Sequence, residues 1–407
     1  MQENTGPAGE ATPAPVGGSA VDFDHHDPSM SPAQRWTQYE QMRSTCPVAH
    51  VERYGGFDVV SGYPEVKEAA ATRDDISSAG DGIFIPPSGL PPLAALEFDG
   101  DEHRAWRKLF DSLLNPAAVR AMEPDVLEIV DFHIDAFADR GEVDLVPAFT
   151  HPVPGAVVGR LFGLSVEESV QNQQLADAFF HSFNTAAFEP ALQAFTEFNL
   201  AHLHARRDHP RDDFLSQLAS GSYQGMDIDD EVAFQILITL LGGGHHSTAS
   251  GLAGLVRHVL INDEVRTRLK HEPKLIGRII EESLRMTTPL QLFARTAKAD
   301  TTVSGCPIPK GDRLLLNYAA ANRDPDEFPD PYTFSLERTR NRHLSFGTGE
   351  HVCQGQPLAR LELRVGLTRL LERLPDLTLT DETDTTAFVS GQLMTLQSLP
   401  ARFTPTR

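Results

Sequence analysis

A loop of three glycines around one cysteine constrains the fold of this chain more than any other feature. Residues 346–355 read Phe-Gly-Thr-Gly-Glu-His-Val-Cys-Gln-Gly, and a pattern typical of a long helix begins near Gln356. Glycines let a backbone turn tightly, while the dipole and the free N–H groups of a helix N-terminus stabilise a thiolate. The loop is therefore suited to hold Cys353 as a thiolate of the kind that binds a metal, but taken alone a lone cysteine in such a turn is more often a buried structural residue.

The spacing of apolar residues predicts a mostly helical chain with a minor β portion. From about residue 100 to 290, apolar residues recur at three- and four-residue spacing, which is typical of amphipathic helices. A further helix is expected to begin at Ser31-Pro32, and the last one to end near Leu374. The other expected elements are a hairpin within 49–60, a long helix over 229–261 interrupted by three glycines, and strands within 292–304 and 313–317.

The composition indicates one globular domain without nucleic-acid or membrane partners. The formal net charge is −22, from 35 basic and 57 acidic residues, which disfavours binding to polyanions. Three cysteines without CxxC spacing suggest neither a disulfide framework nor a cysteine zinc site. Residues 1–21 lack the features of a secretory signal and are expected to be disordered, and no apolar run reaches the roughly 18 residues of a membrane span. We therefore expect a cytoplasmic protein with one domain over residues 22–407.

The cysteine loop resembles the haem-binding loop of the cytochrome P-450 superfamily at each position of the pattern Phe-Gly-x-Gly-x-His-x-Cys-x-Gly. The resemblance implies the mainly helical P-450 fold and a haem b cofactor. It also implies that Cys353 is the proximal ligand of the haem iron, with Phe346 and Gly347 in the surrounding loop. One departure is Gln354, where the family usually has an apolar residue. A polar side chain there is expected to alter packing or hydrogen bonding beside the sulfur, which bears on the redox potential.

Two further motifs fit the same resemblance. Glu282 and Arg285 are spaced so that both lie on one helix face, and they resemble the family's structural Glu-x-x-Arg pair, for which Arg338 is the expected third member. Taken alone, such a pair is an ordinary surface ion pair. Arginine suits carboxylates through its fork of donors. The positions that correspond to the family's haem-propionate partners are His103, Arg107, Arg295 and His351.

The interrupted helix resembles the family's oxygen-activating helix, which carries a glycine-rich bulge, an acid and an alcohol over the haem. Glycines inside a helix cost about 1 kcal/mol each, so three together imply a use for the close approach that they permit. Aligned on the glycines, His246 takes the place of the acid and Ser247 that of the alcohol; a register shifted by one residue makes Thr248 the alcohol.

The imidazole at position 246 leaves two interpretations. With an ordinary pKa of about 6.5, it is able to relay protons at neutral pH. Alternatively, His246 points away from the haem and forms a packing salt bridge, and Ser247 with ordered water delivers the protons.

These features predict a monooxygenase that uses dioxygen, two electrons and two protons to hydroxylate a small, mostly apolar molecule, such as a terpenoid, steroid, aromatic or natural-product scaffold. Electrons are expected from a separate ferredoxin and ferredoxin reductase. The candidate docking patch for them consists of Arg338, Arg340, Arg342 and Arg360. The residues expected by position to line the substrate pocket are Ile83, Phe84, Phe180, Gly243, Gln291, Leu292, Phe293, Leu393 and Met394.

Two alternative functions share this ligand set. The altered relay could favour atypical chemistry on the same cofactor, such as peroxide use, nitric-oxide reduction, oxidative rearrangement or ring coupling. A haem-binding sensor or carrier without turnover would carry the same cysteine and propionate partners. Turnover with a ferredoxin system, compared with turnover on peroxide alone, distinguishes them.

Overall fold

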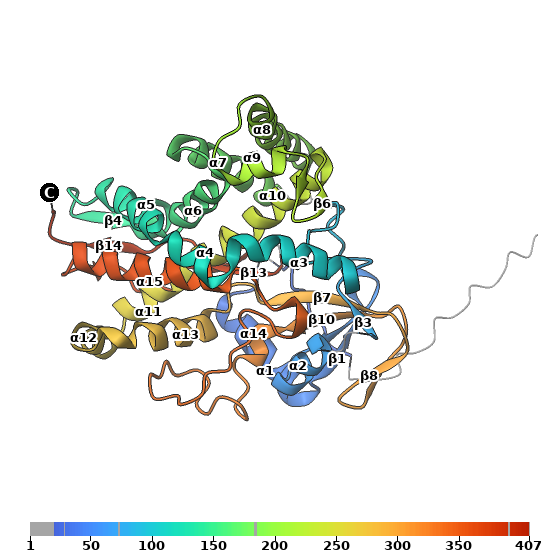
Figure 1. Cartoon of the computed structure of the whole chain (residues 1–407). Coiled ribbons are helices and arrows are strands. Elements are labelled where there is room, and N and C mark those ends of the chain that lie inside the picture. The colour runs from blue at the N-terminus through green and yellow to red at the C-terminus, as the bar shows by residue number, and fades with distance from the viewer. Residues whose placement is uncertain (1–19, 28, 72–73, 183–184, 390, 407) are drawn as a thin grey trace, which may run out of the picture.

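Helices make up most of the molecule, and one five-stranded sheet lies at its side (Figure 1). The computed structural model describes residues 20–27, 29–71, 74–182, 185–389 and 391–406. The helices in the first half of the chain are α1 (Pro32–Thr45), α2 (Tyr63–Ala71), α3 (Gly100–Leu114), α4 (Pro116–Ala121), α5 (Glu123–Asp135), α6 (Pro152–Phe162), α7 (Val166–His181), α8 (Phe188–Asp208) and α9 (Phe214–Ala219). The helices in the second half are α10 (Asp230–Gly244), α11 (His246–Leu260), α12 (Asp263–His271), α13 (Ile276–Thr287), α14 (Tyr318–Ala321) and α15 (Gln356–Arg373).

The main sheet joins strands from both ends of the chain in the order β1-β2-β10-β7-β3. Its strands are β1 (Val48–Val51), β2 (Phe57–Val60), β3 (Ile76–Ser77), β7 (Leu292–Ala297) and β10 (Arg313–Asn317). β10 runs parallel to β2, and the other neighbours are antiparallel. The smaller sheets contain β4 (Glu142–Asp144), β5 (Ser222–Tyr223), β6 (Met226–Asp227), β8 (Thr301–Val303), β9 (Cys306–Ile308), β11 (Thr378–Leu379), β12 (Thr386–Val389), β13 (Leu393–Leu396) and β14 (Pro400–Arg402).

Local sequence signals place several of these elements. Ser31 caps α1 through a capping box with Gln34, and proline occupies the first helical position, so the predicted start of this helix is confirmed. The predicted hairpin (β1 and β2) and the predicted last helix (α15) are also present.

The boundary of the predicted N-terminal tail needs a correction. Residues 1–19 lie outside the described residues, but Ala20 forms a β-bridge with His50, and the N–H of Val21 donates to the carbonyl oxygen of His50 at 2.8 Å. Backbone pairing with β1 therefore brings Ala20 and Val21 into the fold.

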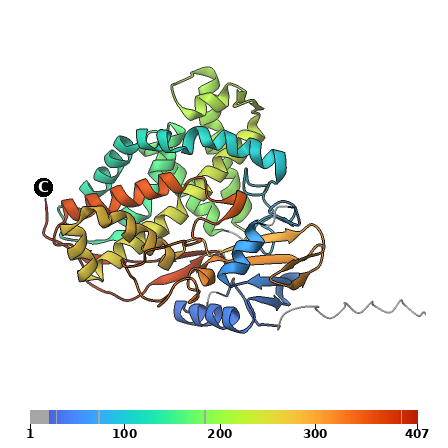
Figure 2. The ribbon, with the colours of Figure 1, turned by 60° about the horizontal axis from the view of Figure 1, so that its bottom comes forward.

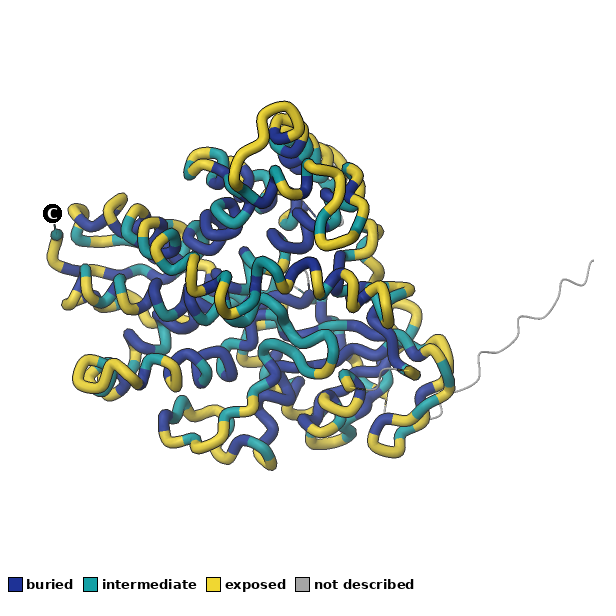
Figure 3. The backbone as a smooth tube through the Cα atoms, in the orientation of Figure 1, coloured by how far each residue is buried: buried dark blue, intermediate teal, exposed yellow. Residues whose placement is uncertain are grey.

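The core is built around α11, whose residues 248–256 are all buried (Figure 3). α11 packs against α6, α13 and α15 in the largest apolar cluster, while two smaller clusters cover the faces of the main sheet. In the turned view the sheet lies to one side of this helical body (Figure 2). In the part of the chain that the structure describes, none of the helices has both the length and the apolar run required to cross a bilayer.

Candidate functional site

The shape of the cysteine loop is fixed by a backbone hydrogen bond within the loop and by a close contact with α2. The N–H of Cys353 donates to the carbonyl oxygen of Phe346 at 2.8 Å, which closes the loop just before α15. Gly347 and Gly349 have left-handed φ angles of 70° and 75°, a conformation that glycine adopts readily. A Cβ on Gly349 would lie 2.5 Å from the carbonyl oxygen of Ala70 in α2. Glycine is therefore required where the loop contacts this helix.

The thiol of Cys353 faces the first turn of α15. Burial raises the pKa of this thiol, while hydrogen bonds from the backbone N–H groups of Gly355 and Gln356 and the nearby Arg107 guanidinium act in the opposite direction. Because burial outweighs these favourable groups, the sulfur stays protonated at neutral pH unless a further cation binds it. A metal ion at the sulfur would supply that charge.

Two buried histidines, one within the loop and one on α3 beside it, have nitrogen atoms without partners among the described residues. The rings of His103, on α3, and His351 are 4.3 Å apart, and both side chains are at least nine-tenths buried. Neither Nε2 of His103 nor Nδ1 of His351 has a hydrogen-bond partner among the described residues. Burial, followed by the charges of His351 and Arg107, lowers the pKa of His103 to about 4. Buried polar atoms are normally hydrogen-bonded, so this pair indicates a missing polar ligand.

The two arginines predicted for the same site lie on different elements. Arg107 lies one turn after His103 on α3 and donates to the carbonyl oxygen of Val352 at 2.6 Å. Arg295, on β7, is 6% exposed and donates to the carbonyl oxygen of Ala294 at 2.8 Å. Asp99 connects these elements, because it precedes α3 and lies 3.8 Å from His351 and 3.5 Å from Lys298, which follows β7.

Glu282 and Arg285 form a buried, bidentate pair on α13. The side chains are 1% and 0% exposed, and both N···O distances are 2.9 Å. Nε of Arg338 lies 3.0 Å from Oε1 of Glu282, and Nδ2 of Asn341 donates to Oε2 at 3.0 Å. The segment before the cysteine loop is thus tied to α13 by charge-assisted hydrogen bonds.

The glycine triplet 242–244 lies at the end of α10, and the predicted interruption is present. The backbone departs from regular helix at His245, with ψ at −78°, rather than at the glycines. A Cβ on the first glycine would lie 3.0 Å from Phe180 of α7, and one on the third would lie 2.8 Å from Val158 of α6. A Cβ on Gly243 would meet no atom within 4 Å. Two glycines therefore allow close helix packing, and the middle one faces open space.

The hydroxyl of Ser247 lies against this open position. Its Oγ donates to the carbonyl oxygen of Gly243 at 2.7 Å, the local bond that serine makes four residues along a helix. Thr248, the alternative alcohol, is 6% exposed and packs within the core. The geometry therefore favours Ser247 as the residue beside the glycines.

His246 contacts an acid on α7. Its Nε2 lies 3.0 Å from Oδ1 of Asp177, and its ring centroid lies 4.9 Å from that of Phe180. Burial lowers the pKa of His246, and Asp177 acts in the opposite direction. This is the geometry of the packing salt bridge, while the proton-relay role stays a prediction.

Comparisons with known proteins agree with this geometry. A family model described as Cytochrome P-450 matches residues 175–404, more than half of the chain. The chain belongs to the cytochrome P-450 family. This P-450 is 33% identical to the steroid C26-monooxygenase of Mycolicibacterium smegmatis, over 90% of this chain and 92% of that protein. It is 30% identical to cytochrome P-450-terp of a Pseudomonas species, over 93% of this chain and 94% of that protein.

Solved structures confirm the predicted fold of this P-450. CYP108D1 from Novosphingobium aromaticivorans superposes with a TM-score of 0.82 at 28% identity, covering 92% of this chain and 95% of that one. The polyketide synthase cytochrome P-450 PksS of Bacillus subtilis gives the same TM-score at 26% identity, covering 91% and 96%. Because its curated relatives include named monooxygenases, this P-450 is an oxidoreductase that incorporates oxygen.

Family membership implies a haem-thiolate cofactor, and the side chains of this P-450 fit one. The thiol of Cys353 faces a helix N-terminus. The partnerless nitrogens of His103 and His351 offer polar contacts to carboxylates, and Arg107 and Arg295 bring positive charge.

Several residues expected to line the pocket meet around β13. Nε2 of Gln291 donates to Sδ of Met394 at 3.1 Å, and Leu393 forms a β-bridge with Leu290. The carbonyl oxygen of Ile83 accepts from Nε2 of Gln392, the residue before β13, at 2.9 Å. Segments far apart in the chain thus converge here.

Leu292 and Phe293 were both expected to line the pocket, but their side chains lie on opposite faces of the sheet. Successive side chains of β7 point to opposite faces of the sheet. Leu292 is fully buried in the cluster with Phe23 and Tyr39 on one face, whereas Phe293 shares the opposite face with Arg295. The expectation that Leu292 lines the pocket was therefore wrong. Phe84 is half-buried, and its carbonyl oxygen accepts from Arg313.

Two further residues of the site, Thr239 and Asp177, were missed by the sequence analysis. Thr239 lies one turn before Gly243 on the same face of α10, and its buried Oγ1 has no partner among the described residues; this spacing could have revealed it. Asp177 carries no local signal, because it is 69 residues from His246. The carbonyl oxygen of Arg107 accepts from Nε2 of Gln354 at 2.7 Å, which gives the unusual glutamine a contact with α3.

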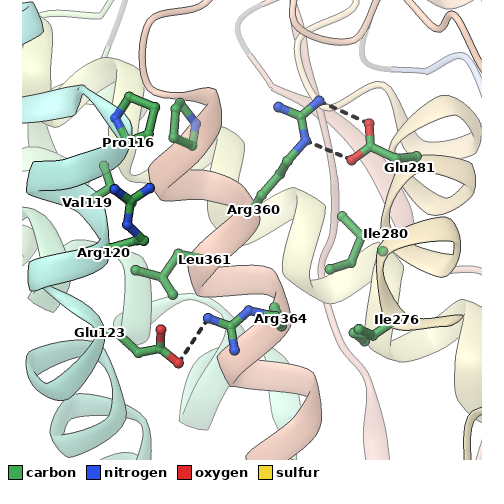
Figure 4. A pocket seen from close by; sticks show the side chains of 12 residues that line it. Pro116, Val119, Arg120, Glu123, Ile276, Ile280, Glu281, Arg360, Leu361 and Arg364 are labelled. Carbon is green, nitrogen blue, oxygen red and sulfur yellow. Dashed lines mark hydrogen bonds and ion pairs between the residues drawn. The ribbon is translucent and has the colours of Figure 1, made fainter. Parts of the chain in front are cut away.

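A groove with a volume of about 310 Å³ lies between α4, α13 and α15 (Figure 4). Its basic side chains are Arg120, Arg360 and Arg364. Arg360 pairs with Glu281 at 2.7 Å and Arg364 with Glu123 at 3.0 Å. α15 starts three residues after the cysteine, so the groove lies within a few turns of it. Of the expected docking arginines, Arg338 is excluded, because its side chain is 9% exposed and binds Glu282.

Proposed function

We propose that this protein is a haem b monooxygenase in which the Cys353 thiolate is the proximal ligand of the iron. The observation that carries the proposal is the glycine-shaped loop, which presents one thiol to a helix N-terminus. A haem held here would supply the redox chemistry by which dioxygen, two electrons and two protons give one water molecule and one oxygen atom incorporated into the substrate. Cys353 contributes electron donation to the iron.

The ligand proposal is tested with Cys353→Ser. The variant should lose the strongly red-shifted Soret band of the reduced carbon-monoxide complex, because an alcohol is a far weaker electron donor than a thiolate. Cys306→Ser is the matched control and should keep the band. A Cys353→Ser protein that retains it would show that another sulfur binds the iron.

We also propose that His103, Arg107, Arg295 and His351 hold the two haem propionates. Support comes from the partnerless nitrogens of both histidines and from the buried position of Arg295. Charge-assisted hydrogen bonds between such groups and carboxylates are roughly twice as strong as neutral ones. These residues would hold the cofactor by its carboxylates and fix its orientation.

For proton delivery, we propose that the Ser247 hydroxyl would pass protons from ordered water into the open space beside Gly243. Its rotatable O–H currently donates to the carbonyl oxygen of Gly243 and could turn toward the open side of that glycine. The His246 imidazole, held by Asp177, is the proposed donor behind it.

The proposed substrate is a small, mostly apolar molecule with a polar group. Support comes from the apolar residues around β13 and from Oγ1 of Thr239 and Oε1 of Gln291, which are buried without partners among the described residues. The relatives named for steroid oxidation and as P-450-terp add a steroid or terpenoid scaffold to this class. A panel of hydroxylated and deoxygenated steroids and monoterpenes should give low- to high-spin shifts that favour the hydroxylated members, and Thr239→Val should weaken that preference.

We propose that a separate ferredoxin, reduced by its own reductase, docks at the groove of Figure 4. Three arginines line it against two glutamates, Glu123 and Glu281, a surplus of one positive charge in a chain of net charge −22. An acidic iron–sulfur protein would meet this local charge. Arg120→Glu should slow ferredoxin-driven reduction, with a smaller effect at high salt, and should leave dithionite reduction unchanged.

A peroxide-driven reaction is the second candidate. The observation that favours it is the His246–Asp177 contact, which occupies the imidazole expected to deliver protons. Product formed with peroxide alone, at a rate equal to or above that with a ferredoxin system, would support it.

A further inference from the structure

Three side chains from separate elements meet beside the α10–α11 break. His151 lies just before α6, Asp177 on α7 and His245 between the two central helices. Nε2 of His151 is 2.9 Å from Oδ2 of Asp177, and Nδ1 of His245 is 3.8 Å from Oδ1 of the same carboxylate. One nitrogen from each histidine and a carboxylate oxygen all lie within 4.8 Å of one another. We refer to His151, Asp177 and His245 as the His-Asp cluster.

The tautomer of His245 is fixed by a backbone contact. Its Nε2 lies 3.1 Å from the carbonyl oxygen of His151, and a carbonyl oxygen only accepts, so Nε2 carries the proton. Nδ1 is then unprotonated, and its lone pair is available as an acceptor or a metal ligand. His245 is fully buried, and its Nδ1 has no hydrogen-bond partner among the described residues. A buried acceptor without a donor is costly, and a backbone carbonyl on the other ring nitrogen is the usual arrangement behind a metal-binding histidine.

The other two members leave a route from solvent. The side chains of His151 and Asp177 are 28% and 25% exposed. Burial by itself raises the pKa of Asp177, but hydrogen bonds from His151 and His246 hold it well below its ordinary range. Burial also holds the pKa of His245 well below its ordinary value. The carboxylate is therefore ionised and the buried imidazole neutral, the protonation states in which both groups bind metals.

We propose that the His-Asp cluster binds one divalent transition-metal ion of the Zn²⁺ class. Imidazole and carboxylate ligands suit such ions. With metal–ligand distances of about 2.0–2.1 Å in tetrahedral geometry, ligand atoms lie roughly 3.3 Å apart, between the 2.9 Å and 3.8 Å seen in the cluster. The fourth position would be taken by water or by Nε2 of His246, which is 3.0 Å from Oδ1 of Asp177.

This ion would be separate from the haem and would join the start of α6, the middle of α7 and the break in the central helix. Binding to the folded state alone raises stability with ligand concentration, so Zn²⁺ should raise the thermal midpoint. None of these residues belongs to the cysteine loop or its basic neighbours. Asp177 also holds His246, the proton donor of the proposed function, but zinc binding is measured without turnover, so failure of the zinc proposal and failure of the proposed function are distinguishable.

The test is titration of ZnCl2 into chelator-treated holoenzyme by isothermal calorimetry, with zinc and iron counted by elemental analysis. We expect one zinc per haem iron. Asp177→Asn and His151→Gln should each weaken binding at least 100-fold. The matched control is Asp230→Asn, which removes the acid of an exposed His204–Asp230 pair 2.7 Å long that has no third ligand among the described residues; it should bind like the wild type.

Several results would overturn the proposal. The wild type could take up no stoichiometric zinc, or Asp177→Asn could bind as tightly as the wild type. An X-ray absorption spectrum with sulfur rather than nitrogen and oxygen around zinc would point to Cys46 or Cys306 instead. The haem content and Soret band of each variant show that it is folded. The two ligand variants change different segments, His151 before α6 and Asp177 on α7, so if one variant misfolds the other remains as the test.

Discussion

The Oγ of Ser247 donates to the carbonyl oxygen of Gly243, four residues earlier, at 2.7 Å. This bond places a hydroxyl beside the one glycine of the triplet that faces open space. We predict that Ser247→Ala lowers the fraction of electrons recovered in product by roughly tenfold, with the remainder appearing as peroxide, because proton transfer by a positioned group contributes at least that much. Ser247→Thr should retain coupling. Thr248→Val tests the register shifted by one residue. A larger loss of coupling in this variant than in Ser247→Ala would assign proton delivery to Thr248.

A second prediction uses the contact between His246 and Asp177. His246→Asp would bring a second carboxylate near Asp177, and a nearby like charge raises the pKa of a carboxyl group. We therefore expect the single variant to lower coupling, and the exchange His246→Asp with Asp177→His to recover most of it. The ratio of product formed to reductant consumed measures both. Unchanged coupling in His246→Ala would mean that the imidazole only packs against α7 and that Ser247 and water form the proton path.

The third prediction compares a buried and an exposed ion pair. Glu282→Gln removes the charge that holds Arg285 and Arg338, and breaking such a buried pair typically costs about 3–5 kcal/mol. Glu337→Gln breaks the 2.7 Å contact with Arg268, where the glutamate side chain is 74% exposed, and should cost no more than about 1 kcal/mol. Urea unfolding of both variants gives the comparison; equal losses would show that burial does not decide the strength of this network.

A fourth prediction concerns acid sensitivity. His133 on α5 is 8% exposed, its Nε2 has no partner among the described residues, and burial lowers its pKa to about 4. As the pH falls below about 6.5, the unfolded chain binds a proton that the folded chain does not, so the stability is present above that pH and is lost toward pH 4. At pH 5 this amounts to about 2 kcal/mol.

His133→Leu should therefore reduce the loss of unfolding free energy between pH 7.5 and pH 5 by about that amount. The exposed His209, replaced by glutamine, serves as the control and should leave the pH dependence unchanged. If the unfolding free energy of His133→Leu falls with pH as steeply as that of the wild type, the acid sensitivity arises from other residues.

Local signals in the sequence predicted much of this molecule. The capping box at Ser31, the hairpin glycines and the start of α15 each depend on neighbours a few residues away, and each element is present. The glycine triplet predicted an interruption, but the break falls at His245, because the glycines stay helical where they pack against α6 and α7.

The errors and omissions have a common physical origin in long-range packing. Leu292 was assigned to the pocket by its position along the chain, and the alternation of β7 turns it to the other face of the sheet. The contact of His246 with Asp177 joins residues on two helices, so no local sequence pattern predicts it. The same holds for the unpaired Nδ1 of His245, which depends on a carbonyl group 94 residues away.

The contact between Gly349 and the carbonyl oxygen of Ala70 has a consequence for biosynthesis. The two residues are 279 positions apart (349 minus 70), and the loop has room for no side chain there. While the chain emerges from the ribosome, α2 exists long before the segment that must rest on it. With Cys353 as the proposed haem ligand, cofactor capture would be a late event that waits for nearly the whole polypeptide, and such distant contacts are slow to form. Cells making this protein would thus accumulate a nearly complete, haem-free intermediate whenever haem supply lags behind translation.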